Sequence, residues 1–315
     1  MTRGIGSADM DMDMDMDMDM GTASPAITTT GVVRPIGVSP ALAKLANEGW
    51  YHGNKWPPQD VLGSWKNAAP KEFPRHYWSS YHYAFTVLAE FVTVKNTAGE
   101  TRWNLPSLRA SLDAILPKTS QGVEKELAEL IELIEYRPGV MTEALAQREN
   151  LWAYFSGIFM SDAWSAPYTR DLVEIAGRVG QFQAMYYKRL FNRPRASQYS
   201  PGLLPPIHVP GHASFPSGHA TEAYLIAHCL EKVMPAAAYT PPTTVQQPDD
   251  TPLRRMAQRI ARNREVLGLH FPSDSEAGKL LAKETFDILM ECKTINDPNN
   301  PQEGLIAKAA KEWWS

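Results

Sequence analysis

The chain has 315 residues, of which 43% are hydrophobic and 21% are charged, a composition that excludes a fibrous or wholly disordered protein. Residues 1–20 carry a net charge of −5, from six Asp and one Arg, so the formal charge of −4 leaves +1 for the remaining residues. Such a nearly neutral body gives no argument for a nucleic-acid partner. With only Cys229 and Cys292, a disulfide framework is excluded and at most one bridge can form.

Membrane and export signals are not visible in the sequence. No apolar run is long enough to cross a bilayer, and no signal-peptide-like apolar stretch follows the first residues. We therefore expect a soluble protein without a transmembrane segment, cytoplasmic by default.

The N-terminal segment is of low complexity. Asp9–Met20 consists of six Asp-Met pairs, and six like charges on one face of an isolated strand would repel one another, so we interpret the repeat as a solvated tail. Soft-metal binding by the Met sulfurs is the alternative. Thr-, Pro- and Gly-rich sequence continues this tail, which predicts a disordered region over residues 1–40 and one domain over residues 41–315.

Helical periodicity dominates the domain. Val123, Leu127, Leu130, Ile131 and Ile134 fall on one stripe, as in an amphipathic helix. Because strand-like runs are scarce, we predict an all-α helical bundle, and its apolar N-terminal helices are compatible with a homo-oligomer. Further helices are predicted over residues 77–94, 141–159, 169–191, 218–234, 253–267, 276–292 and 304–314.

Two proline-rich stretches interrupt the helices. Residues 194–216 contain six prolines, too many for a helix, and are dense in Arg, His and Ser, which is typical of a functional loop. Residues 235–252 have no such concentration and are interpreted as a surface connection.

The first two motifs suit an oxyanion. Lys188 and Arg195 flank a predicted helix end, where an ammonium and a guanidinium can converge on a tetrahedral anion. In Pro-Ser217-Gly218-His219 a turn opens a helix, so backbone N–H groups and the Ser217 hydroxyl can face the anion, and Gly218 allows close approach. His219 can exchange a proton with a bound oxygen.

The third motif combines a nucleophile with an orienting group. The Ser-x-x-Glu pattern at Ser273 predicts a helix that starts at Asp274, with His270 just before it. Asp274 can then accept a hydrogen bond from one ring nitrogen of His270, which leaves the other nitrogen as a lone-pair donor. Arg264 supplies a third cation.

Together the order K-x6-R, PSGH and R-x5-H-x3-D resembles the signature shared by type 2 phosphatidic acid phosphatases, bacterial acid phosphatases and vanadium-dependent haloperoxidases; here it spans residues 188–274. The resemblance implies a helical bundle in which the signature lines one pocket. It implies that His270 is the phosphohistidine nucleophile or the vanadate ligand, that His219 is the general acid or base, and that Asp274 orients His270. The implied oxyanion-binding residues are Lys188, Arg195, Ser217, Gly218 and Arg264.

The chain departs from the family pattern at two positions. The family has Pro after the second basic residue, whereas Ala196 follows Arg195, and Arg193 precedes Pro194. Arg193 is therefore the alternative oxyanion ligand, although Arg195 keeps the six-residue spacing. Asn263 replaces the family Ser before the third Arg.

The resemblance leaves two reactions open. The favoured one is a haloperoxidase reaction with vanadate as cofactor, in which hydrogen peroxide oxidises a halide and an organic acceptor is halogenated. His212 supports bromide, since bromide-oxidising members of the family are similar in having His here. The alternative is a cofactor-free phosphohydrolase acting on phosphate esters. A non-catalytic oxyanion-binding protein is the third hypothesis.

Overall fold

The computed structural model describes residues 73, 75–159, 166–235 and 251–313. The chain divides into two units, of which one comprises Ser80–Ser315 with Met1–Met20 and the other Gly21–Ser79. In the second unit, the described residues include a 3-10 turn at Arg75–Tyr77. The predicted tail and its boundary at residue 40 lie outside the described residues.

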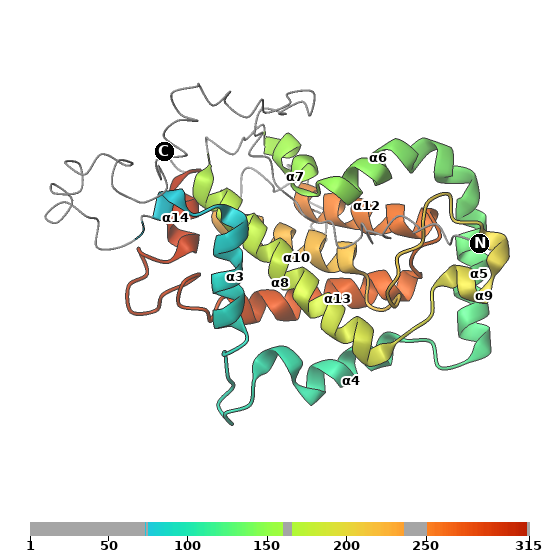
Figure 1. Ribbon diagram of the computed structural model, residues 1–315, viewed down its shortest axis with the longest axis horizontal. Helices are drawn as coiled ribbons and strands as arrows, with labels where there is room; N and C mark the ends of the chain where they lie inside the picture. Colours follow the sequence, from blue (N-terminus) through green and yellow to red (C-terminus); the bar gives the residue numbers. More distant parts are fainter. Residues whose placement is uncertain (1–72, 74, 160–165, 236–250, 314–315) are drawn as a thin grey trace, which may run out of the picture. The chain divides into compact units, whose positions relative to one another are not determined.

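The described part of the larger unit is helical, as predicted (Figure 1). Its extended pairing is limited, within the described residues, to an isolated bridge between Lys95 and Thr101. The helices are α3 (Ser80–Phe91), α4 (Pro106–Ile115), α5 (Ser120–Glu132), α6 (Arg137–Glu149), α7 (Trp152–Phe159), α8 (Pro167–Phe191), α9 (Ala196–Tyr199), α10 (Gly218–Val233), α12 (Pro252–Val266), α13 (Pro272–Leu289) and α14 (Leu305–Lys311).

Several helix assignments from the sequence were wrong in detail. The helix predicted over residues 141–159 is two helices, α6 and α7, separated at Asn150. α13 begins at Pro272 rather than Asp274, because proline has the backbone angle and the missing N–H that suit a first helical position. Two helices were not predicted from the sequence: α4, which buries Leu108 and Leu112, and the short α9, which lies within the proline-rich stretch 194–216 that was interpreted as non-helical.

α10 is the central helix of the unit. It packs against α8, α12 and α13 and is buried along most of its length (Figure 1). The approach of α13 is close at Gly278, where a Cβ atom would lie 2.8 Å from the Ser217 carbonyl oxygen and 2.8 Å from the Ala220 Cβ. Gly278 therefore lets α13 pack directly against the first turn of α10.

The described helices and thiols bear on two further predictions. None of these helices combines the length and apolar character that a membrane span needs. Cys229 and Cys292 are both buried as free thiols, so the bridge that the sequence permitted is not formed.

We expect Gly278→Ala to lower the free energy of unfolding by about 1–3 kcal/mol, because overpacking outweighs the roughly 1 kcal/mol that Ala gains over Gly in a helix. Urea unfolding measures the change. Gly139→Ala in α6 is the matched control: nothing lies within 4 Å of its Cβ position, so this variant should be as stable as the wild type or more so. Equal effects of the two substitutions would contradict the packing argument.

Candidate oxyanion site

The end of α8 positions the first pair of cations. Asn192 adopts a left-handed conformation, with φ of 48°, and its N–H donates to the Lys188 carbonyl at 2.8 Å, which closes the helix. Lys188 is therefore in the last turn, and its Nζ donates to the carbonyl oxygens of Ala213 and Ser214 at 2.9 and 3.0 Å. These bonds hold the ammonium of α8 against the loop that precedes α10.

The PSGH turn forms the N-terminus of α10. The Ser217 N–H donates to the Asp274 carbonyl at 2.9 Å, which joins this turn to α13. The Ser217 side chain accepts from the Ala220 N–H at 3.3 Å, so it caps the helix and does not line the cavity described below. Gly218 does line it, and a Cβ there would lie 4.0 Å from Lys188 Cε.

His270 and Asp274 lie on either side of the start of α13. The His270 Nδ1 is 3.1 Å from Asp274 Oδ2, as the spacing predicts. Asp274 is fully buried, and the same oxygen also accepts from the Phe271 N–H at 3.0 Å and from the Ser214 hydroxyl. The carboxylate thus joins the loop before α10 to the turn that carries His270.

The turn between α12 and α13 has its own support. Gly268 adopts a φ of +72°, which glycine tolerates without a Cβ penalty. Arg137 of α6 donates to the carbonyls of Val266, Leu204 and Leu203 at 3.0, 2.8 and 2.7 Å. Arg137 therefore holds the turn that leads to His270, although α6 lies outside the signature residues 188–274.

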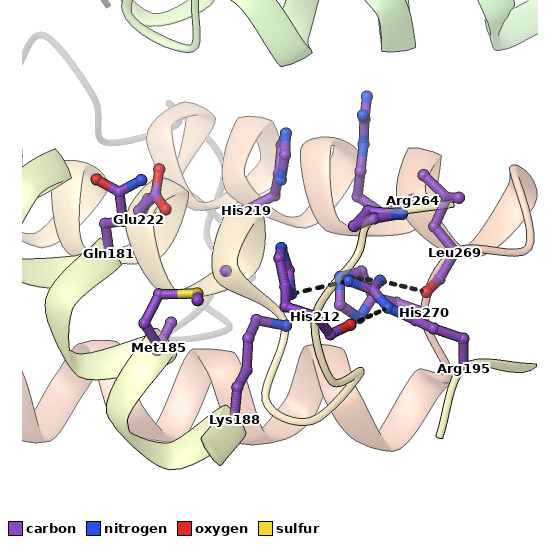
Figure 2. Close-up of a pocket in the computed structure, with 13 residues that line it drawn as sticks. Gln181, Met185, Lys188, Arg195, His212, His219, Glu222, Arg264, Leu269 and His270 are labelled. Carbon is purple, nitrogen blue, oxygen red and sulfur yellow. Dashed lines mark hydrogen bonds between the residues drawn. The ribbon is translucent and has the colours of Figure 1, made fainter. Parts of the chain in front are cut away.

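These elements enclose a cavity of about 30 Å³ (Figure 2). This is far smaller than the roughly 300–1,000 Å³ pockets that hold organic ligands, so it suits a small inorganic group. Arg195 makes several contacts in this cavity. Its Nη1 donates to the Leu269 carbonyl at 2.8 Å and lies 3.3 Å from His270 Nε2. Its Nη2 lies 3.0 Å from His212 Nδ1. The cavity is lined by Lys188, Arg195, His212, Gly218, His219, Arg264 and His270, with Gln181, Glu222 and others.

Arg264 and His219 occupy a separate side of the cavity. Figure 2 shows both side chains extending away from the group formed by Lys188, His212 and His270. The Arg264 guanidinium donates to the Ala144 carbonyl of α6, and His219 Nε2 is buried without a hydrogen-bond partner among the described residues. The three cations therefore line one cavity, but Arg264 is directed toward α6.

Burial and positive charge determine the protonation of the site. Burial, followed by the charges of Lys188 and Arg195, lowers the pKa of His212 to about 3. Burial and nearby cations also lower the pKa of His219 and of His270 well below its usual range. Burial alone would raise the pKa of Asp274, but its hydrogen bond to His270 and the positive charge of Arg193 hold it below its usual range. The imidazoles are therefore neutral and Asp274 is ionised at neutral pH.

The two candidate arginines have different places. Arg195 lines the cavity and contacts His270, whereas Arg193 is absent from the cavity lining and donates from Nη1 to Asp274 Oδ1 at 2.6 Å. The six-residue spacing thus selects the arginine that lines the cavity.

Several residues of the site were missed in the sequence analysis. Glu222 lines the cavity, one helical turn after Gly218, and the Ser214 hydroxyl reaches Asp274. Glu126 contacts Arg193 from α5, at 2.7 Å. Glu222 and Ser214 could have been predicted from the sequence, because they lie within a few residues of His219. Glu126 could not, because it is distant from all three motifs in the sequence.

The described residues contain no cluster of three or more His, Cys, Asp or Glu side chains suited to a metal cation. The cavity lining instead combines the cationic donors Lys188, Arg195 and Arg264 with neutral imidazoles and one carboxylate, Glu222, and its cationic donors suit an oxyanion. No protein-family model matches the sequence, and no curated protein is significantly similar to it.

The lowered pKa of His212 predicts a pH-dependent stability. An unfolded histidine, with a pKa near 6.5, takes up a proton as the pH falls, while folded His212 stays neutral down to about pH 3. The folded state therefore loses stability between these values, by up to about 1.4 kcal/mol per pH unit for one such group.

His212→Gln should reduce this slope, measured by urea unfolding between about pH 4.5 and 7.5. His208→Gln removes an exposed imidazole from the same loop and is the control. Identical pH dependence in His212→Gln and the wild type would contradict the assignment.

Proposed function

We propose that this protein is a vanadium haloperoxidase-like enzyme that uses hydrogen peroxide to oxidise a halide, with bromide preferred. The observation that carries the proposal is the small cavity that Lys188, Arg195, His219 and His270 all line. A volume of about 30 Å³ suits one small inorganic group, which is compatible with a bound oxyanion but leaves no room for an enclosed organic substrate.

The residues present fit vanadate. Arg195 can only donate, so the neighbouring His270 Nε2, 3.3 Å away, is unprotonated and carries a lone pair, which a bound vanadate would take over from the Arg195 N–H. That lone pair would be the vanadium ligand, and Lys188, Arg195 and the backbone at Gly218 would hold the negatively charged oxygens. When bound, vanadate supplies the activation of peroxide toward halide oxidation.

The protein's own groups have distinct roles in this proposal. Lys188 and Arg195 neutralise the anion, and Asp274 orients the His270 ring. The buried and neutral His219 would accept a proton from hydrogen peroxide at Nε2, which is unpartnered among the described residues, and could donate that proton to an oxygen that leaves the site as water. His212 extends the wall of the cavity beside Arg195.

A phosphohydrolase is the second candidate, and the His270–Asp274 pair favours it. A neutral imidazole that donates through Nδ1 to a carboxylate presents a nucleophilic Nε2. Nε2 would form the bond to phosphorus as the P–O ester bond breaks. His219, whose pKa is lowered in the free site, would have to take up a proton as the negatively charged ester binds, and would then donate it to the leaving oxygen. Water would then hydrolyse the phosphohistidine.

Parallel assays of the same preparation distinguish the reactions. We expect bromination of a phenolic acceptor with bromide, hydrogen peroxide and orthovanadate, and little hydrolysis of para-nitrophenyl phosphate. Hydrolysis without bromination would overturn the proposal in favour of the phosphohydrolase. Tungstate binding with neither activity would leave a non-catalytic oxyanion-binding protein.

His219→Ala separates binding from turnover. We expect the variant to lose at least about 100-fold in kcat while its tungstate affinity changes little, because general acid–base catalysis contributes roughly 10²–10⁴-fold. Isothermal titration calorimetry measures the binding. A parallel loss of tungstate affinity would mean that His219 holds the anion instead.

A further inference from the structure

Arg193 is a buried arginine of the signature region that does not line the cavity. Instead, it donates a hydrogen bond to the Asp274 carboxylate. We infer that Arg193 is a positioning residue, which holds the Asp274 carboxylate in the orientation that fixes the His270 ring. The inference rests on the proposed oxyanion site but not on the choice between its two reactions.

The two oxygens of Asp274 have separate partners. Oδ1 accepts from Arg193 Nη1 at 2.6 Å, while Oδ2 faces His270 Nδ1 at 3.1 Å and accepts from the Phe271 N–H at 3.0 Å. The Ser214 hydroxyl also donates to Oδ2. Because Arg193 contacts the oxygen that His270 does not use, it fixes the rotation of the carboxylate without competing with the imidazole.

Arg193 is itself held on several sides. Nη2 pairs with Glu126 Oε2 at 2.7 Å, Nη1 also donates to Ser273 Oγ at 2.7 Å, and the guanidinium carbon lies 3.7 Å from the centre of the Phe271 ring. Glu126 Oε1 in turn accepts from the Ser273 N–H at 2.7 Å, at the start of α13. A planar guanidinium with several donors fits these partners, and a lysine ammonium could replace only some of them.

The consequence of this arrangement is a single tautomer of His270. Arg195 is a donor, so Nε2 is the acceptor and Nδ1 carries the proton that Asp274 accepts. With Arg193 removed, Oδ1 would lose its charged partner and the carboxylate could rotate away from Nδ1. The ring would then be free to turn or to exchange tautomers, and the lone pair in the cavity would no longer be fixed.

The tautomer can be measured without any bound ligand. We would label the histidines of the full-length protein with ¹⁵N, assign the His270 ring signals with His270→Gln, and compare the wild type with Arg193→Met, Arg193→Lys and Glu126→Gln. Arg262→Met is the matched control, because Arg262 also bridges two carboxylates, those of Glu129 and Glu265 at 2.7 and 2.5 Å. Tungstate affinity of each variant is measured by calorimetry, and thermal unfolding reports stability.

We expect the wild type and Arg262→Met to show one tautomer, protonated at Nδ1. Arg193→Met should give a mixture and weaken tungstate binding about tenfold or more, the range usual for loss of a group that orients a ligand. Arg193→Lys should retain much of the wild-type tautomer population and tungstate affinity. Glu126→Gln should weaken tungstate binding by a smaller factor than Arg193→Met does.

An unchanged tautomer and tungstate affinity in Arg193→Met would overturn the inference, whatever its melting temperature, since Arg193 would then only stabilise the fold. If Arg193→Met does not fold, an unchanged tautomer and tungstate affinity in Glu126→Gln, which removes one charged partner of Arg193, has the same meaning. A wild type that binds no tungstate would refute the proposed function, while the tautomer comparison would still decide the role of Arg193.

Discussion

The arrangement of the site depends on one buried negative charge. Asp274 is inaccessible to solvent, and its ionised side chain is stabilised by Arg193, Ser214, the Phe271 N–H and His270. A buried carboxylate without such partners would cost several kcal/mol or take up a proton. Its donors come from the loop after α8, the loop before α10 and the start of α13, so satisfying this one charge brings the three motifs together.

The buried cations of the cavity are stabilised by backbone carbonyls. Lys188 and Arg195 are buried, and both donate to backbone carbonyls of the neighbouring loops and turns. These carbonyls disperse the positive charges without neutralising them. Nearby positive charge in turn keeps the adjacent imidazoles unprotonated, as the lowered pKa values of His212 and His270 indicate. The cavity therefore retains an excess of positive potential, which an anion can satisfy.

Sequence patterns predicted the helices well where periodicity and caps were clear, as in α8, α10 and α12. The chemistry of three motifs and their resemblance to a family signature also predicted one site for Lys188, Arg195, His219 and His270, and all four line the same cavity. The direction of Arg264 could not be predicted, because it depends on a carbonyl of α6 that is distant in the sequence. The roles of Glu126 and Arg137 were hidden for the same reason, since their partners are set by tertiary packing.

The contacts of α5 and α6 bear on how small a fragment can retain the geometry of this site. All the signature residues lie between Lys188 and Asp274, but Glu126 and Arg137, which hold the turn of His270 and the start of α13, precede that interval. A fragment limited to residues 188–274 would keep the signature residues but lose the side chains of Glu126 and Arg137, which support the turn of His270 and the start of α13. Minimal versions of this scaffold therefore need the helices upstream of α8, even though none of the described residues of those helices lines the cavity.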